Sequence, residues 1–195
     1  MMSEKIDSKK GGAGRPRSIQ VTETILSTTL FLLEREGYKK LSMELIAKTA
    51  GAGKQTLYRW WPNKASIVLE AVRERCQLEI PVPELGSVKQ DLSEYIGNTC
   101  RLLNGSTGKI IAALIAEAQF DDEFSLLLDK EFISTRREAL ISILKRGIEQ
   151  GEINDCKNLN VLSDFCYGAI WYRLLNRHAP LDDEFVQHIV ETLIS

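Results

Sequence analysis

The chain has 195 residues, 44% of them hydrophobic and 27% charged, and a formal net charge of −2 at pH 7. This composition is typical of a soluble globular protein with one or two domains. No apolar run approaches the roughly 20 residues that a membrane span needs, and the polar N-terminus is not a secretory signal. We therefore expect a cytoplasmic protein with no membrane partner.

The charge is unevenly distributed along the chain. Residues 1–64 carry 12 Lys and Arg against 6 Asp and Glu, a net charge of +6, whereas residues 65–195 carry 13 against 21, a net charge of −8. A basic first third on an acidic body indicates that only the first third meets a polyanion.

The N-terminal third is predicted to hold four helices after a disordered arm. Residues 1–18 are polar, Gly-rich and without a hydrophobic period, so we expect a disordered basic arm. From Ile19 apolar residues recur at helical spacing until Gly37. Ser42 and Asn63 are the expected N-caps of later helices. The remaining helices are expected at 43–50, 54–61 and 64 to about 78, separated by Gly51-Ala52-Gly53 and by Pro62.

The remainder of the chain also has a helical period throughout. Pro81 and Pro83 mark a linker, and no later segment alternates like a β-strand. The expected helices cover residues 87–103, 110–120, 122–150, 159–177 and 183–194. The predicted fold is all-α with about nine helices, four in the N-terminal part over 19–78 and five in a C-terminal helical bundle.

Two short helices joined by a Gly-containing turn of about three residues form a helix-turn-helix pattern. In this pattern the first helix braces the second, whose N-terminal residues reach base edges in the major groove. Leu57 is expected to face inward, toward Ala47 of the preceding helix. The residues left on or near the outward face are of types that bind phosphates and bases: Lys54, Gln55, Thr56, Tyr58 and Arg59.

Residues 25–68 resemble the DNA-binding domain of the TetR/AcrR repressors. The resemblance rests on landmarks at fixed spacing: Gly37-Tyr38, Ser42-Met43, Ile46-Ala47, Ala50-Gly51, Thr56-Leu57-Tyr58-Arg59 and Pro62-Asn63-Lys64. A looser resemblance to TetR-type C-terminal domains covers residues 116–119 and 167–175. The resemblance implies a homodimeric repressor that binds double-stranded DNA at a palindromic operator. It implies a helix-turn-helix DNA-binding domain over 19–64 and a helical ligand-binding and dimerisation domain over 65–195.

The resemblance also implies roles for individual residues. Thr56 and Tyr58 match positions that usually contact the DNA backbone, and Lys64 matches a usual phosphate contact. Lys54 and Gln55 match variable positions of the recognition helix, so they are candidates for base reading; by chemistry lysine suits guanine and glutamine suits adenine. In the arm, Gly14-Arg15-Pro16-Arg17 resembles an AT-hook core, with Arg15 and Arg17 as candidate minor-groove residues.

The body is expected to dimerise and to hold a small, apolar effector. Two half-sites about one DNA turn apart require a two-fold dimer. Candidate interface residues, some of which are expected to face the subunit core instead, are Phe165, Ala169, Tyr172, Phe185, Ile189 and Leu193. Candidate pocket residues are Tyr95, Cys100, Phe120, Phe124 and Trp171. The alternative is that most of these residues occupy ordinary core positions.

The sequence contains no convincing catalytic, cofactor or metal motif. Residues 105–109, Gly-Ser-Thr-Gly-Lys, fall short of a complete phosphate loop, and the four cysteines include no CxxC pair. We therefore expect no enzyme activity, no cofactor and no metal. Two alternatives remain open: a regulator of the same fold without a small-molecule effector, and a helical adaptor or enzyme that does not bind DNA.

Overall fold

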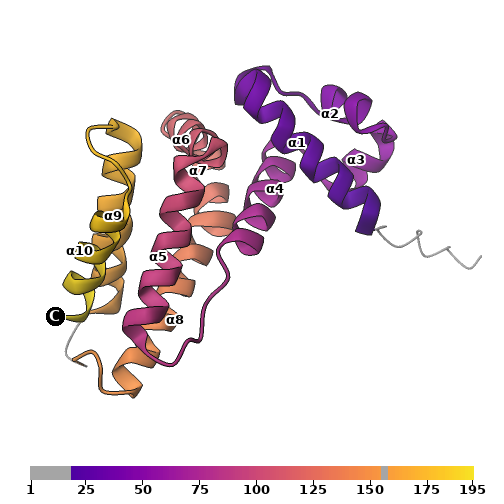
Figure 1. The fold of residues 1–195 in the computed structure, drawn as a ribbon. Helices are drawn as coiled ribbons and strands as arrows, with labels where there is room; N and C mark the ends of the chain where they lie inside the picture. The colour runs from indigo at the N-terminus through magenta and orange to yellow at the C-terminus, as the bar shows by residue number, and fades with distance from the viewer. Residues whose placement is uncertain (1–18, 155–157) are drawn as a thin grey trace, which may run out of the picture.

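The computed structural model describes residues 19–154 and 158–195, and within these ranges every regular element is a helix (Figure 1). The N-terminal helices are α1 (Ile19–Lys40), α2 (Met43–Ala50), α3 (Lys54–Trp60) and α4 (Lys64–Glu79). The body contains α5 (Val88–Asn104), α6 (Ser106–Ala118), α7 (Asp122–Leu128), the π-helical segment η1 (Asp129–Ile133), α8 (Ser134–Glu149), α9 (Leu159–Asn176) and α10 (Asp183–Ile194). The predicted all-α fold is confirmed.

The predicted caps set most helix boundaries in the N-terminal third, although α1 continues past Gly37 to Lys40 and α3 ends at Trp60, one residue earlier than expected. The Ser42 side chain accepts a hydrogen bond of 3.1 Å from the backbone N–H three residues later, which begins α2. Gly51, with φ 64°, takes the left-handed conformation that ends α2. Asn63 caps α4 through a reciprocal capping box. At Gly37, φ 74° and ψ 167° interrupt the helical backbone before the last turn of α1.

The N-terminal helices form a small unit at one end of the molecule, on the far side from α9 and α10 (Figure 1). In this unit α1 packs against both α2 and α4, and α2 packs against α3. Five side chains at its centre are at most 1% exposed: Ile25, Ile46, Leu57, Trp61 and Ile67. This shared apolar core fixes the angle between α2 and α3 without any metal or disulfide among the residues described.

The body is organised around α5, which packs against α6, α8 and α10, while α8 also packs against α9. Glycine permits one especially close approach in this bundle. A Cβ atom on Gly108 of α6 would lie 1.9 Å from the carbonyl oxygen of Leu103 on α5. The two helices can therefore cross closely only because residue 108 has no side chain.

Two body helices differ from the expected ranges. The single helix expected over 122–150 is divided by η1, a wide turn that changes the phase of the helix. Within η1, Phe132 is buried in the core, and Glu131 lies 3.1 Å from the guanidinium of Arg73 on α4. The helix expected over 110–120 begins earlier, at Ser106, because its first turn packs closely on α5, and it ends at Ala118.

The end of α1 joins the N-terminal unit to the body. The Tyr38 ring stacks on Phe124 of α7 with 5.2 Å between ring centroids. Beside this stack, the Lys39 ammonium lies 3.4 Å from the Glu117 carboxylate of α6. An aromatic contact therefore joins α1 to α7 and an ion pair joins α1 to α6, so the N-terminal unit is tied to two helices of the body.

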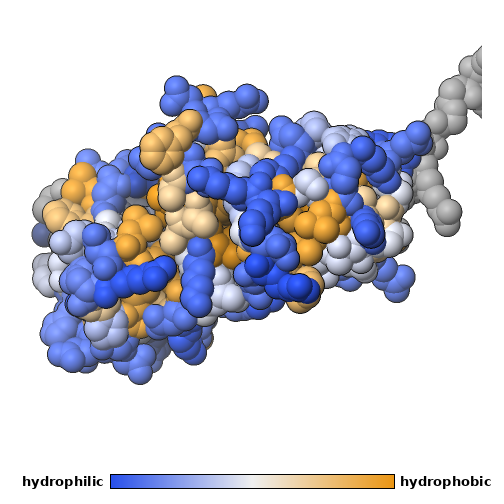
Figure 2. Space-filling view, turned by 90° about the horizontal axis from the view of Figure 1, so that it is seen from above, coloured by the Kyte–Doolittle hydropathy of each residue, from blue (hydrophilic) through white to orange (hydrophobic). Residues whose placement is uncertain are grey.

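Hydrophilic side chains cover most of the face seen from above, around smaller hydrophobic areas (Figure 2). The exposed apolar side chains are thus separated by charged and polar ones on this face. Among the helices described, none is both long enough and apolar enough to cross a membrane.

Candidate DNA-binding site

The recognition helix α3 is held by residues of its inner face. Leu57 is fully buried and Trp61, directly after the helix, is 1% exposed. The Trp61 indole N–H donates a hydrogen bond of 2.6 Å to the Glu70 carboxylate of α4, so the end of α3 is tied to α4 by polar as well as apolar contact. Trp60 is half-buried against Trp61 in an edge-to-face arrangement. The inner face of α3 therefore has a structural role, as the sequence predicted for Leu57.

The outer face of α3 carries the predicted DNA contacts. Lys54, Gln55, Tyr58 and Arg59 are exposed, and Thr56 is half-buried. The Arg59 guanidinium lies 5.7 Å from the centre of the Trp60 ring. The structure thus brings the five predicted α3 residues together on or beside one surface.

An acidic residue on α2, for which no DNA-related role was predicted from the sequence, belongs to the same surface. The Glu44 carboxylate lies 2.7 Å from the Lys54 ammonium and accepts a hydrogen bond of 3.3 Å from the Tyr58 hydroxyl. The hydrogen bond from Lys54 lowers the pKa of Glu44, and the same contact raises the pKa of Lys54. Nothing in the spacing of the two helices along the sequence reveals this contact between Glu44 and α3.

Lys64, the predicted phosphate contact at the start of α4, is already engaged at the joint between the two units. Its ammonium donates a hydrogen bond of 2.8 Å to the Tyr38 carbonyl and lies 4.1 Å from the centre of the Tyr38 ring. Partial burial lowers the pKa of Lys64. Contacts with Tyr38 of α1 therefore hold the Lys64 ammonium in place. The arm residues Arg15 and Arg17 lie outside the described residues.

The predicted effector residues do not share one pocket. Tyr95, Cys100 and Phe124 are buried in the core, so the alternative of ordinary core positions holds for them. Phe120 lies beyond the end of α6 and is 92% exposed, which contradicts its assignment to an internal pocket. Phe120 follows the exposed residues Ala113 and Ala116 at helical spacing, so the ring continues the outer side of α6.

Trp171 does line a hollow, which lies between η1, α8 and α9. This hollow has a volume of about 270 Å³. Its lining combines aromatic and apolar groups with an ion pair between Arg137 and Asp164. The lining residues are Phe132, Ile133, Arg136, Arg137, Asp164, Tyr167, Gly168 and Trp171.

The floor of this hollow is ordered by buried hydroxyl groups. The Tyr167 hydroxyl donates a hydrogen bond of 2.9 Å to the Arg136 carbonyl, and it lies 3.1 Å from the Tyr95 hydroxyl. Burial raises the pKa of Tyr167 well above its ordinary value. Tyr95, although outside the hollow, therefore helps to fix one of its walls.

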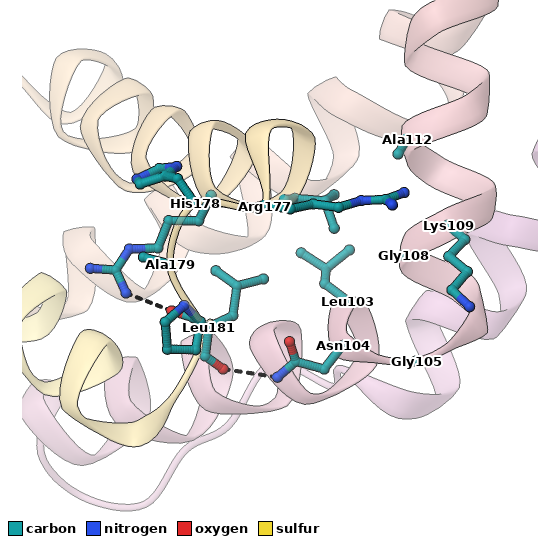
Figure 3. Close-up of a pocket in the computed structure, with 13 residues that line it drawn as sticks. Leu103, Asn104, Gly105, Gly108, Lys109, Ala112, Arg177, His178, Ala179 and Leu181 are labelled. Carbon is teal, nitrogen blue, oxygen red and sulfur yellow. Dashed lines mark hydrogen bonds between the residues drawn. The ribbon is translucent and has the colours of Figure 1, made fainter.

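A second hollow lies where the first turn of α6 faces the loop between α9 and α10 (Figure 3). Its volume is about 530 Å³. The Asn104 side-chain amide donates a hydrogen bond of 2.9 Å to the Leu181 carbonyl at its base, and the Arg177 side chain reaches toward Ala112 of α6 (Figure 3). Lys109 lines the same hollow, so residues 105–109, rejected as a phosphate loop, form a helix start at a solvated groove.

The predicted dimer residues divide between two environments. Phe165 and Tyr172 lie on the outer face of α9 and are 65% and 62% exposed. Ala169 and Ile189 are half-buried. Phe185 and Leu193 are buried in the core of the chain itself, so their assignment to a dimer interface is wrong for this subunit structure.

Two further exposed apolar residues lie on the same side of α9 as Phe165 and Tyr172. Val161 and Leu175 are each 46% exposed, and they follow the helical spacing of Phe165 and Tyr172. We call the stripe Val161, Phe165, Tyr172 and Leu175 the α9 face. In the sequence these residues look like any other apolar residues of the helix. A helical-wheel plot of α9 could have shown that they lie on the side opposite its buried residues.

Comparisons with known proteins agree with this architecture. Residues 25–71 match the family model described as bacterial regulatory proteins, tetR family, and residues 82–193 match the model described as the tetracyclin repressor-like C-terminal domain. The uncharacterized HTH-type transcriptional regulator YdeS of Bacillus subtilis is 32% identical over 177 residues, which cover 91% of this chain and 89% of YdeS. The DNA-binding transcriptional repressor TetR of Mycobacteroides abscessus is 25% identical over 171 residues, covering 87% of this chain and 90% of the relative.

A solved structure resembles the whole chain. The crystal structure of the TetR family transcription regulator SCO0332 superposes with a TM-score of 0.79 at 30% sequence identity. The match covers 90% of this chain and 97% of that chain. The similarity therefore spans both the DNA-binding unit and the body.

Proposed function

Because the chain belongs to the TetR family of DNA-binding transcriptional regulators, we propose that it is a homodimeric repressor that a small molecule releases from a palindromic operator. The observation that carries the DNA-binding part of this proposal is the outer face of α3, where Lys54, Gln55, Tyr58 and Arg59 are exposed together. We assign DNA binding to residues 19–64, assisted by the arm 1–18, and dimerisation and effector binding to residues 65–195.

Each residue of the DNA-binding surface has a distinct proposed role. Lys54 and Gln55 read bases, whereas Thr56, Tyr58 and Arg59 contact the sugar-phosphate backbone. Lys64 contributes a phosphate contact from the start of α4, and Arg15 and Arg17 enter the adjacent minor groove.

The test of this assignment is a fluorescence-anisotropy titration of the protein on its own upstream DNA and on a random-site pool. We expect tight binding that weakens steeply with salt and that Tyr58→Ala reduces. Gln55→Ala should relax the sequence preference at one base pair, whereas Lys64→Ala should weaken binding to all DNA sequences alike. Absence of binding to either DNA at low salt would contradict the proposal.

Dimerisation is proposed to occur through the α9 face. One helix-turn-helix makes few contacts, and two recognition helices must be about 34–36 Å apart to enter successive major grooves. The α9 face offers four exposed apolar side chains at helical spacing on the outermost helix pair of the body (Figure 1). A two-fold pairing of this face gives a self-complementary interface.

Effector binding is proposed for the hollow lined by Trp171. Its volume of about 270 Å³ is just below the range of about 300–1,000 Å³ that is usual for ligand sites, which favours a small ligand. Gly168 lines the hollow, and it also lies among the exposed residues of the outer side of α9. A ligand there can therefore change the packing of the α9 face, and hence the spacing of the recognition helices.

A thermal-shift screen with indole, phenol, benzoate and hexanol tests the effector site. A compound that binds the native protein raises its melting temperature and weakens operator binding. Gly168→Leu places a side chain in the hollow and should abolish the shift, whereas Gly97→Ala on α5 should leave it intact. A shift that persists in Gly168→Leu would place the ligand elsewhere, and no shift with any compound would favour a regulator without such an effector.

A further inference from the structure

The outer surface of the DNA-binding unit contains a donor and an acceptor side by side. The Glu44 carboxylate and the Lys54 ammonium are 2.7 Å apart, and both side chains are more than half exposed. The first belongs to α2 and the second begins α3, so the pair bridges the two helices of the helix-turn-helix. Because both groups face solvent, they remain available to a ligand that approaches the outer face of α3.

A third residue fixes the orientation of the pair. The Tyr58 hydroxyl donates to the same Glu44 oxygen at 3.3 Å, and the Lys54 ammonium lies 5.8 Å from the centre of the Tyr58 ring. Lys54 and Tyr58 are four residues apart on α3 and therefore share one face of that helix. The carboxylate thus has two partners from α3, which restrains its rotation before any DNA is bound.

The chemistry of the pair matches one kind of base pair. In the major groove guanine presents two acceptors, N7 and O6, and its cytosine partner presents the N4 amino donor. A lysine suits the guanine acceptors, and a glutamate accepts from the cytosine amino group. An A·T pair instead presents the thymine O4 acceptor and a methyl group on that side, which offer a carboxylate no hydrogen bond.

We propose that Glu44 and Lys54 together read one G·C base pair in each half-site, Lys54 donating to guanine and Glu44 accepting from cytosine. This inference rests on the proposed contact of α3 with DNA. It also gives Glu44 a second effect. Away from the operator, its negative charge holds Lys54 and repels phosphates, so it weakens binding to random DNA and widens the difference between specific and non-specific binding.

The proposal makes opposite predictions for the two members of the pair on random DNA. Glu44→Gln removes the repulsion and frees Lys54 to neutralise a phosphate, so it should tighten random binding. One additional neutralised phosphate steepens the salt slope by about 0.9, which corresponds to roughly 3.5-fold more affinity lost between 50 and 200 mM salt. Lys54→Met should weaken random binding and should not steepen the slope.

The experiment selects an operator with the wild-type protein from a random-site pool and then measures anisotropy on single-base-pair variants. Replacing the assigned G·C pair by A·T should weaken wild-type binding roughly 5-fold to 150-fold, the usual range for one mismatched pair. Glu44→Met and Lys54→Met, which remove the acceptor and the donor, should each lose most of this discrimination. Replacing the guanine by 7-deazaguanine, which lacks N7, should weaken the wild type and leave Lys54→Met unchanged.

Glu36→Gln is the matched control, because it removes a carboxylate from the far end of α1, where the partner is Arg35 rather than a residue of α3. The control should keep both the wild-type base preferences and the wild-type salt slope. An operator without a G·C preference in the half-site, or a Glu44→Met variant with the wild-type preferences, would overturn the assignment while DNA binding itself stands. Wild-type protein that binds no DNA in the same assay would instead refute the proposed function.

Discussion

Replacing Phe165 by alanine should separate the proposed dimer. The ring lies on the outer side of α9 and is 65% exposed in the single chain. A fully enclosed aromatic side chain buries roughly 150–250 Å², so pairing of the α9 face would cover roughly 130 Å² of this ring. At about 25 cal/mol per Å² this area contributes roughly 3 kcal/mol, of which alanine would retain a small part.

The effect on association is doubled, because a two-fold interface contains Phe165 twice. A loss of about 5 kcal/mol for the two copies raises the dimer Kd by roughly 10³-fold to 10⁴-fold, since a factor of ten corresponds to about 1.4 kcal/mol. Sedimentation velocity across a micromolar concentration series measures this change. Leu126→Ala is the control, because Leu126 is 74% exposed on α7 and lies outside the α9 face. An unchanged Kd for Phe165→Ala, or an equal effect of Leu126→Ala, would refute the interface.

Three further changes test other parts of the structure. Gly108→Ala should lower the free energy of unfolding in urea by at least about 3 kcal/mol, because its Cβ would overlap the Leu103 carbonyl; Gly97→Ala, with ordinary contacts in mid-helix, should raise it by about 0.5–1 kcal/mol. Lys64→Met should make the salt slope of DNA binding shallower by about 0.9. If this variant loses thermal stability but keeps the wild-type slope, Lys64 has a structural role and no phosphate contact. Burial raises the pKa of Tyr38 from 10.0 to about 12; the folded state therefore retains this proton, and the stabilisation present below pH 10 is lost as the pH rises to 12. The free energy of unfolding in urea should therefore fall less between pH 10 and pH 12 for Tyr38→Phe than for the wild type.

The fold of the DNA-binding unit could be predicted because its signals are local. Ser42 and Asn63 each bond to a backbone N–H three residues away, and Gly51 needs only its own backbone freedom. A boundary of this kind depends on a few neighbouring residues, so the sequence is sufficient to locate it. The division between the inner and outer faces of α3 follows for the same reason, from the helical period alone.

The features that the sequence did not reveal depend on contacts between elements. Glu44 meets Lys54 only because the core beneath α2 and α3 sets their angle. Phe120 follows Ala113 and Ala116 at helical spacing, and only the packing of α6 shows that this side of the helix is the exposed one. Phe185 has the same apolar character as Phe165, and only the packing of α10 on α5 shows that Phe185 belongs to the subunit core. Residue type and period predicted that these side chains are apolar or charged, but not which neighbour each one has.

The joint at Tyr38 connects the body to the proposed phosphate contact of Lys64. An ammonium group has three N–H donors, and the hydrogen bond from Lys64 to the Tyr38 carbonyl uses one of them. The remaining donors can still bind a phosphate, so the joint positions Lys64 without occupying it. Because the Tyr38 ring stacks on Phe124, a displacement of α7 moves Tyr38 and therefore the ammonium. A shift of about 1 Å is enough to lengthen a hydrogen bond beyond its normal range of about 2.7–3.2 Å, so small movements in the body can weaken DNA binding without unfolding the helix-turn-helix.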